Sequence, residues 1–241
     1  MTGEAGEAGN ADCMPDKDAE KMIAAEHAAG WVKDGMVVGL GSGSTAAHAV
    51  RALARRMESE GLRFVGIPTS KATAALARSL GIPLTSFDEH PLIDLTIDGA
   101  DEIDGRFRTI KGGGGAFLRE KIVAAASKRM AAIVDASKLV ENLGACKVPL
   151  EVPPMAARLV VDMMKAWGTR AKVRRTDDFD PFVTDQGNYV VDAYFDYIEN
   201  PRDLATRLDA IPGVLAHGLF LDEVDVLVIG RGTDVEVRER R

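Results

Sequence analysis

The amino-acid sequence predicts an α/β protein, in which a parallel sheet with helices on both faces is joined to a second, smaller α+β domain. Two observations lead to this fold class. Over residues 16–146, short apolar stretches alternate with stretches of helical periodicity, and this alternation is typical of parallel sheets. After Lys147 the order becomes β-α-β-β-α-β, which is the order of a ferredoxin-like unit.

The first part of the chain supplies a Rossmann-like sheet. Each apolar stretch is followed by apolar residues at helical spacing, such as Ala46, Ala49, Val50 and Leu53. The apolar stretch 224–229 near the end of the chain is expected to return to this sheet. The expected strands are 36–40, 63–67, 92–97 and 130–134, and the expected helices are 17–31, 46–57, 71–80 and 118–128.

The second part of the chain supplies the smaller domain. A helix is expected between Pro154 near its start and Gly168 just past its end, and the segment 182–187 is either a hairpin arm or a loop. We therefore predict a catalytic domain of residues 16–146 plus 220–241 and a smaller domain of 147–219. The expected elements of the smaller domain are strands 150–152, 172–175, 189–195 and 214–220 and helices 154–167 and 201–210.

Composition narrows the possible classes of protein. The net charge of −7 argues against a general nucleic-acid binder, so an anionic ligand must be attracted by local lysines. Cys13 and Cys146 lack the spacing of a metal site or a disulfide framework, which favours a reducing cytoplasm. No apolar run approaches the roughly 20 residues of a membrane span. Residues 1–15 read as a disordered extension, with a cloning remnant as the alternative.

A glycine- and serine-rich turn follows the first strand, in the stretch GLGSGSTAAHAV. Such a turn directs backbone N–H groups at an anion, and Ser44 and Thr45 can cap the helix or donate to phosphate. The G-x-G-x-x-A spacing also fits dinucleotide binding, but no acidic residue stands about 20 positions later. A nucleoside-triphosphate loop would need a Gly-Lys-Ser/Thr ending. We therefore predict a site for a small phosphorylated ligand, with an ordinary tight turn as the alternative.

Two aspartates follow the third strand, in IDGADEID. Open α/β sheets bind ligands beyond the carboxyl ends of their strands, where Asp98 and Asp101 could bind a metal, transfer a proton or hold sugar hydroxyls. Glu102 and Asp104 read more simply as parts of a solvated loop. We expect no metal, because the histidines are scattered without ligand spacing; they are His27, His48, His90 and His217.

Two further strand ends carry charged residues. The stretch IKGGGGAFLREK places Lys111 before four glycines and Glu120 about one turn into the next helix. Successive glycines lose much backbone freedom on folding, so they indicate a close approach to a ligand or to other backbone. Taken alone, Glu120 is equally well a solvated partner of a neighbouring basic residue. The stretch VDASK places Lys138 at a fourth strand end, and this recurrence predicts one site along a single rim of the sheet.

Taken together, these stretches resemble ribose-5-phosphate isomerase of the A type, over nearly the whole chain from about Glu20. GLGSGSTAAH, DGADEID, IKGGGGAFLREKI and VDASK occur in the family's order and approximate spacing, followed by DAIPGV and HGLF. Any one motif alone would be weak, but four linked motifs are specific. The resemblance implies interconversion of D-ribose 5-phosphate and D-ribulose 5-phosphate through an enediol(ate). It also implies that no metal or organic cofactor is needed.

The resemblance implies roles for the matching positions. Glu120 looks like the base that moves a proton between C1 and C2, and Lys111 looks like the cation beside the enediolate. Asp98 and Asp101 look like groups that contact sugar hydroxyls and assist ring opening. Ser42 departs from the family, where threonine is more frequent, but a hydroxyl remains. The implied substrate-binding residues, several of them for phosphate, are Lys21, Ser42, Gly43, Ser44, Thr45, Gly99, Ala100, Gly112, Gly113, Gly114 and Lys138.

The implied chemistry fits these residue types, because aldose–ketose isomerisation needs one base and one charge that stabilises a developing oxyanion. The alternative is a sugar-phosphate-sensing domain without catalysis, which would normally carry a basic helix-turn-helix segment. The residues before the first helix are too few and too acidic for that. A related deaminase or lactonase would keep the phosphate loop and change the acid–base set. We expect a cytoplasmic homodimer or homotetramer whose partner is a small sugar phosphate, with no nucleic acid or membrane.

Overall fold

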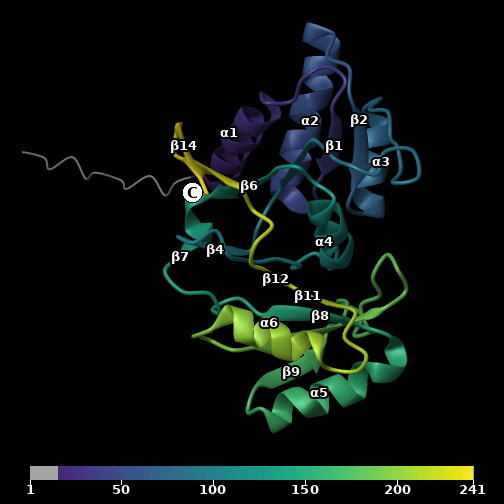
Figure 1. Ribbon diagram of the computed structural model, residues 1–241, viewed down its shortest axis with the longest axis vertical. Helices are drawn as coiled ribbons and strands as arrows, with labels where there is room; N and C mark the ends of the chain where they lie inside the picture. The colour runs from purple at the N-terminus through teal and green to yellow at the C-terminus, as the bar shows by residue number, and fades with distance from the viewer. Residues whose placement is uncertain (1–15, 241) are drawn as a thin grey trace, which may run out of the picture.

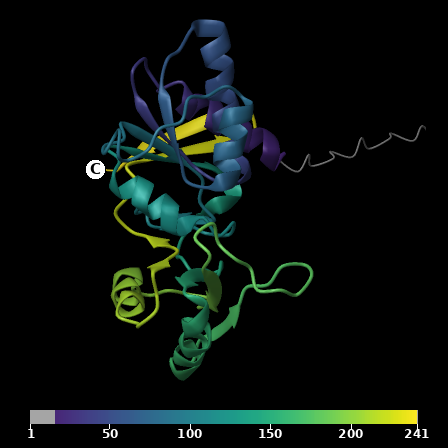
Figure 2. The same cartoon turned by 90° about the vertical axis from the view of Figure 1, so that its right-hand side faces the viewer.

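The computed structural model describes residues 16–240, and the extension predicted for residues 1–15 lies outside the described residues. The chain forms two parts, one around a six-stranded sheet and one around a four-stranded sheet (Figure 1). A quarter turn shows the same two parts (Figure 2). The predicted α/β class is confirmed, while the boundaries near residues 146 and 220 stay a prediction. Within residues 16–240, no helix has the length and apolar character needed to cross a membrane.

The six-stranded sheet has the order β14-β13-β6-β3-β1-β2. All of its strand pairs are parallel except β13–β14 at one edge, so the carboxyl ends of five strands meet at one rim. The predicted return of residues 224–229 to this sheet is confirmed, because β13 pairs with β6. The antiparallel strand β14 was not predicted. The strands are β1 (Val37–Leu40), β2 (Val65–Pro68), β3 (Leu95–Asp98), β6 (Met130–Asp135), β13 (Val226–Arg231) and β14 (Asp234–Glu239).

Helices cover both faces of this sheet. Alternate residues of β6 enter different apolar clusters: Ala131 and Ile133 pack with α1 and α2, whereas Ala132 and Val134 pack with Phe117 of α4. Since successive side chains of a strand point to opposite faces, α4 lies on the face opposite α1 and α2. The helices of this part are α1 (Lys17–Ala29), α2 (Gly43–Glu60), α3 (Lys71–Ser79) and α4 (Phe117–Ala125).

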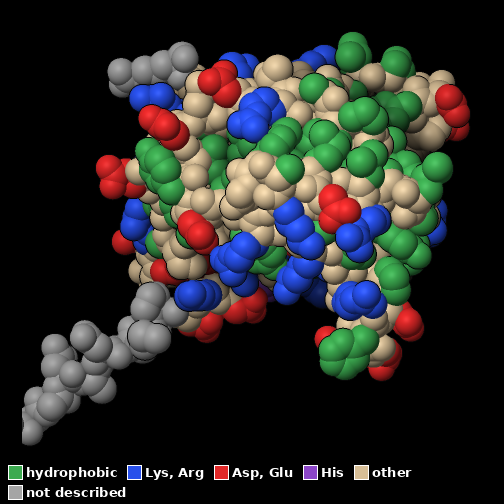
Figure 3. Space-filling view, turned by 90° about the horizontal axis from the view of Figure 1, so that it is seen from below, with side chains coloured by type: hydrophobic (Ala, Val, Ile, Leu, Met, Phe, Trp, Pro, Cys, Tyr) green, Lys and Arg blue, Asp and Glu red, His purple; other side chains and the backbone are tan. Residues whose placement is uncertain are grey.

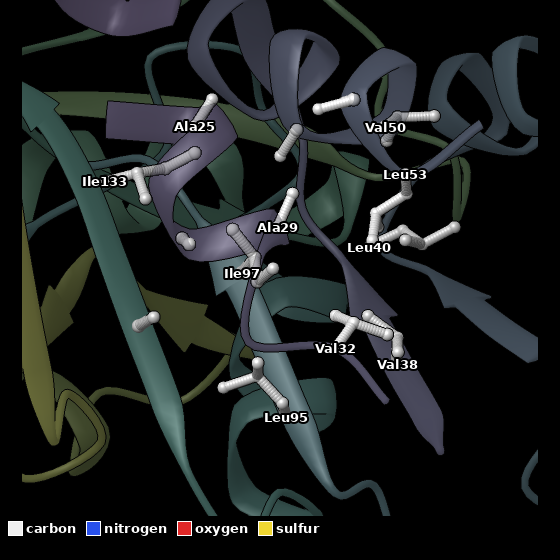
Figure 4. Close-up of a cluster of buried hydrophobic side chains, with 14 of the residues drawn as sticks. Ala25, Ala29, Val32, Val38, Leu40, Val50, Leu53, Leu95, Ile97 and Ile133 are labelled. Atoms are coloured by element: carbon white, nitrogen blue, oxygen red, sulfur yellow. The ribbon is translucent and has the colours of Figure 1, made fainter. Parts of the chain in front are cut away.

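The core below α1 is built from small side chains. Ala25 and Ala29 are fully buried and lie near Ile133 and Ile97 of the sheet (Figure 4). Alanine leaves a helix backbone free to approach the strands closely, and a Cβ at Gly230 of β13 would overlap the α1 backbone. The close packing brings the N-terminal helix to the rim of the sheet.

The four-stranded sheet is antiparallel, with the order β11-β8-β10-β9. The chain order β8-α5-β9-β10-α6-β11 confirms the predicted ferredoxin-like unit. Residues 182–187 form a loop with one isolated bridge, between Val183 and Tyr189. The elements are β8 (Val148–Val152), α5 (Ala157–Ala166), β9 (Arg170–Val173), β10 (Tyr189–Tyr194), α6 (Pro201–Asp209) and β11 (Ala216–His217), with a short 3-10 turn, η2 (Pro154–Ala156), before α5.

The single strand predicted for residues 214–220 is wrong, because it divides into β11 and β12 (Leu219–Phe220), which belong to different sheets. Gly218 stands between them. Its N–H donates to the carbonyl of Pro149, and its own carbonyl accepts from Lys111 N, each at 2.8 Å. A Cβ at this position would overlap the Lys111 carbonyl, so the chain changes sheets at a residue that has no side chain.

A third sheet, with the order β12-β5-β4-β7, was not predicted. Its strands lie between the two larger parts (Figure 1). Each has only two or three residues, which is too short to show a period of two. The strands are β4 (Glu102–Asp104), β5 (Thr109–Ile110) and β7 (Leu139–Val140), and a 3-10 turn, η1 (Ala136–Lys138), precedes β7. The third sheet holds in place the chain segments that flank the predicted site.

Candidate active site

A cavity of about 140 Å³ lies at the carboxyl rim of the parallel strands. The structure brings every predicted site residue to it, with Asp98 directly behind its wall and the others lining it. The cavity includes groups that follow β1, β3, β5 and β6. The lining residues are Lys21, Ser42, Gly43, Ser44, Thr45, Gly99, Ala100, Asp101, Lys111, Gly112, Gly113, Gly114, Glu120 and Lys138.

Lys111 lies at the centre of a buried group of charges. Its Nζ lies 3.0 Å from Oδ2 of Asp98 and 3.2 Å from Oε2 of Glu120, and it donates to the carbonyl of Gly99. Burial alone would lower the pKa of this ammonium, but the charges of Asp98 and Glu120 outweigh burial and raise the pKa of Lys111. Lys111 is therefore a fixed positive charge.

Asp98 connects two of the loops at the rim. It ends β3 and is almost fully buried. Its Oδ1 accepts the N–H groups of Ser42 at 3.0 Å and Gly99 at 2.8 Å. A Cβ at Gly41 would overlap this carboxylate. The glycine in the turn after β1 is thus needed for the close approach of Asp98.

Glu120 lies in the first turn of α4 and is only 6% exposed. The alternative that Glu120 is a solvated partner of a neighbouring basic residue is therefore wrong. Its Oε2 and Oδ2 of Asp98 have no hydrogen-bond partner within residues 16–240, although both lie within ion-pair distance of Lys111. Burial, and then the negative charge of Asp98, raise the pKa of Glu120 to about 8, and Lys111 opposes this only in part. One ammonium faces two buried carboxylates, so proton uptake by Glu120 relieves the excess negative charge. Glu120 can therefore exchange a proton near neutral pH.

Two of the glycines after Lys111, Gly112 and Gly115, are required by close contacts. Gly112 has a φ of +103°, and a Cβ there would lie 2.6 Å from the ring of Phe117. Gly115 has a φ of +78°, and a Cβ there would lie 2.5 Å from the ring of Phe182. The N–H of Gly113 donates to Oδ2 of Asp101 at 2.7 Å. The loop is thus packed on both sides, and Asp101 is held against it.

The N-terminus of α2 opens onto the cavity. The helix begins at Gly43, and Ser42 occupies the N-cap position without a side-chain cap bond. Its hydroxyl instead lies 2.7 Å from that of Thr69. The suggestion that Ser44 or Thr45 caps the helix is wrong, because both lie inside its first turn. Within the described chain, no side chain accepts a hydrogen bond from the backbone N–H groups in the first turn of α2. These N–H groups therefore remain available to an anion.

Two lysines approach the same helix end from other elements. Nζ of Lys21 in α1 donates to Oγ of Ser44 at 3.4 Å, and Lys138 ends the turn η1 after β6. The buried carboxylate of Glu20 accepts the N–H groups of Gly232 at 2.8 Å and Ala136 at 3.3 Å. Glu20 therefore ties α1 to two strand ends and holds Lys21 near the cavity.

A wider groove of about 770 Å³ lies on the small domain. Seen from below, where this domain lies, the surface shows many Lys and Arg side chains (Figure 3). Asp192 is the one acidic residue among those lining the groove, and it is buried in ion pairs with Arg174 and Lys147. Among the described residues that line the groove, none offers a free carboxylate for proton transfer, so the smaller cavity is the candidate active site.

Sequence reasoning missed or misread several polar residues around the site. Arg174 and Asp192 gave no signal, because a charged residue in a strand-like stretch is usually on the surface. Glu102 and Asp104, which read as solvated, are both buried. Glu102 accepts the N–H of Gly144 at 2.8 Å, and Asp104 pairs with Arg108 at 2.5 Å. Both support the loops instead of binding solvent.

The fold and the site define a class: an α/β protein with a small, charged cavity at the carboxyl rim of a parallel sheet, suited to an anionic ligand. The family model described as ribose 5-phosphate isomerase A (phosphoriboisomerase A) matches residues 65–234. The chain belongs to this family, and the resemblance seen in the motifs is confirmed.

Similar proteins cover nearly the whole chain. Ribose-5-phosphate isomerase A of Sphingopyxis alaskensis is 54% identical over 222 residues, which is 92% of this chain and 96% of the relative. The protein of the same name from Parvibaculum lavamentivorans is 49% identical over 226 residues, which is 90% of this chain and 97% of the relative. The similarity therefore spans both parts of the fold.

Solved structures agree with this assignment. A D-ribose-5-phosphate isomerase in complex with phospho-erythronic acid has a TM-score of 0.90 and 35% identity, covering 93% of this chain and 100% of that chain. Ribose 5 phosphate isomerase A from Neisseria gonorrhoeae has a TM-score of 0.87 and 35% identity, and the match covers 95% of this chain and 99% of the Neisseria chain. Both parts of the fold are therefore shared with known members of the family.

Proposed function

We propose that this chain interconverts D-ribose 5-phosphate and D-ribulose 5-phosphate through an enediolate, in the non-oxidative branch of the pentose phosphate pathway. The observation that carries the proposal is the position of Lys111 between Asp98 and Glu120 at one cavity. The names of the relatives and the phospho-erythronic acid complex of a similar structure support it.

Glu120 is the proposed base. As a carboxylate it removes the proton from C2 of the open-chain aldose, and the electron pair moves through C1 to O1, which gives the enediolate. Protonated Glu120 then returns the proton to C1, while the O2 hydroxyl loses its proton and O1 gains one. No atom is gained or lost overall. Because Glu120 is buried with a raised pKa, both its protonated and its charged forms are accessible near neutral pH.

Lys111 is the proposed stabiliser of the enediolate. Its charge is fixed and buried, so it needs no reorganisation when negative charge develops on the sugar oxygen. Asp98 and Asp101 are the proposed contacts of the sugar hydroxyls and assist ring opening. Asp101 is already oriented by the N–H of Gly113.

The phosphate is proposed to bind at the N-terminus of α2. Uncapped N–H groups, the hydroxyls of Ser44 and Thr45, and the ammonium groups of Lys21 and Lys138 meet there. Binding the phosphate away from the reacting carbons positions C1 and C2 beside Glu120. The binding energy of this remote group thus supports the chemical step.

The deciding experiment measures ketopentose formation by the purified full chain with ribose 5-phosphate, with and without a chelator. We expect turnover that the chelator does not change. Absence of ketopentose would contradict the proposed activity, and loss of turnover with chelator would contradict the proposed metal-free mechanism.

We also propose a homodimer or homotetramer in the cytoplasm, with the small domain contributing to the contacts between subunits. The wide groove on this domain supports a contact surface there. Light scattering on the purified chain will test the proposal, and a monomer at micromolar concentration would contradict it.

A further inference from the structure

We propose that Arg174 of the small domain positions the glycine loop of the active site, which we define as residues 112–115. In this role Arg174 holds Asp101 in place through one peptide group and directs the N–H of Gly114 to the cavity through the next. The inference rests on the proposed isomerase function, because the loop lines the same cavity.

The guanidinium of Arg174 makes a direct connection from the small domain to the loop. Arg174 follows β9 and is 8% exposed. Its Nη1 donates to the carbonyl of Gly112 at 3.0 Å and to the carbonyl of Gly113 at 2.9 Å. No other side chain in residues 16–240 donates to these two carbonyls.

Asp192 sets the orientation of the Arg174 guanidinium. Its Nε lies 3.0 Å from Oδ2 of Asp192, and its Nη2 lies 2.5 Å from Oδ1. Lys147 donates to the same carboxylate at 2.7 Å, and the backbone N–H of Arg174 donates to Val190 at 2.7 Å. A guanidinium is planar, so binding Asp192 through one edge fixes the direction of the remaining donors.

The contact with Arg174 orients two peptide groups of the loop, and with them two backbone N–H donors. The described chain has no cis peptide bond, and in a trans peptide the C=O and N–H groups point in opposite directions. The peptide that joins Gly112 to Gly113 directs its carbonyl at Arg174 and its N–H at Asp101, 2.7 Å away. It therefore transmits the position of Arg174 to Asp101.

The next peptide presents a free donor. Its carbonyl, from Gly113, also points at Arg174, so the N–H of Gly114 points away from Arg174. This N–H has no acceptor within the described chain, and Gly114 lines the cavity. An N–H that opens onto the cavity is suited to a developing oxyanion, and Lys111 lines the same cavity.

Glycine has little intrinsic preference for one backbone conformation, so a loop of glycines needs an external contact to hold it. Arg174 supplies that contact, and its guanidinium also lies 5.5 Å from the ring of Phe182, which packs over Gly115. Within residues 16–240, Arg174 makes no hydrogen bond to the N-terminus of α2, where we propose that the phosphate binds. Loss of Arg174 should therefore impair the chemical step more than substrate binding.

The test compares Arg174→Ala and Arg174→Lys with Arg175→Ala, a matched removal of the adjacent arginine, which is exposed. Turnover of ribose 5-phosphate, affinity for phospho-erythronic acid and thermal unfolding are measured for each full-length variant. We expect kcat to fall by about 10- to 100-fold in both Arg174 variants. KM and the affinity for phospho-erythronic acid should stay within about threefold of wild type. Arg174→Lys is expected to lose kcat as Arg174→Ala does, because one ammonium cannot bind Asp192 and both carbonyls. Arg175→Ala should retain wild-type kcat.

Added guanidinium should restore part of the kcat of Arg174→Ala and none of that of Glu120→Gln. A folded Arg174→Ala with kcat within threefold of wild type would overturn the proposal, as would a loss confined to KM. If Arg174→Ala does not fold, Arg174→Lys decides, and wild-type kcat in that variant would overturn the proposal. Failure of the isomerase function itself is separate, because it would show as an inactive wild-type chain.

Discussion

The Nζ atom of Lys111 lies 3.2 Å from Oε2 of Glu120, and both side chains are almost completely buried. An isolated buried pair of this kind would normally hold both groups in their charged forms. Here Asp98 adds a second carboxylate 3.0 Å from the same ammonium. Burial, and then the charge of Asp98, raise the pKa of Glu120, while Lys111 stays charged. A proton-accepting group thus lies beside a permanent positive charge.

Glu120→Gln should abolish proton transfer and leave the shape of the site intact. We expect kcat for ribose 5-phosphate to fall by about 10²- to 10⁴-fold, since that is the usual contribution of a general base. Calorimetry should show that phospho-erythronic acid still binds. Glu199→Gln, at an exposed position, is the control and should be fully active. Near-normal turnover of Glu120→Gln would exclude Glu120 as the base.

The pH dependence of kcat/KM should report the raised pKa of Glu120. The base acts as a carboxylate, so kcat/KM should rise from pH 6 and level off above a pKa of about 8. Lys111 adds no step in this range, because its pKa is raised. The rise should be missing from the residual activity of Glu120→Gln. A profile that falls between pH 6 and pH 8 would be incompatible with this assignment.

Lys111→Ala should lower kcat by about 10²- to 10³-fold, by analogy with the loss of a donor to an oxyanion. Removing the ammonium also leaves Asp98 and Glu120 buried without their cation. We therefore expect the wild-type rise of kcat/KM with pH to move further upward in the variant. Steady-state kinetics over a pH series measure both effects. A change confined to KM would make Lys111 a binding residue only.

Lys21→Ala should act on substrate binding. Lys21 lies at the end of the cavity where we propose that the phosphate binds, and it donates to Ser44. We expect KM to rise by about 10-fold, which corresponds to the loss of one charged hydrogen bond, with kcat close to wild type. Lys17→Ala, on an exposed part of the same helix, is the control. A large loss of kcat without a change in KM would contradict a phosphate-binding role.

Gly41→Ala should disturb the site through packing. The added Cβ would overlap the carboxylate of Asp98, so Asp98 or the turn after β1 must move. We expect a loss of about 1–3 kcal/mol in the free energy of unfolding and a strong loss of kcat. Gly105→Ala, where nothing lies within 4 Å of the new Cβ, should leave both quantities unchanged. Equal stability and activity of the two variants, measured by chemical denaturation and assay, would refute the packing argument.

Much of the fold could be predicted because its signals are local. The alternation of apolar strands with helical periodicity identified the parallel sheet, and the β-α-β-β-α-β order identified the small domain. The third sheet could not be found, since its strands are two or three residues long. The division at Gly218 was also missed, because a single glycine within an otherwise strand-like stretch can equally mark a bulge or a close approach. Only the hydrogen bonds of Gly218 to Pro149 and Lys111 reveal it.

The sequence by itself determined which polar residues stand at the strand ends, and that the site belongs at the carboxyl rim, because parallel strands place their carboxyl ends together. Only the tertiary structure decided the ionisation of these residues and the support of the loop. The raised pKa of Glu120 depends on burial and on the distance of Lys111 and Asp98 from it, and Arg174 reaches Gly112 across 62 positions of the chain. Burial and long-range contact are properties of packing, which no local pattern encodes.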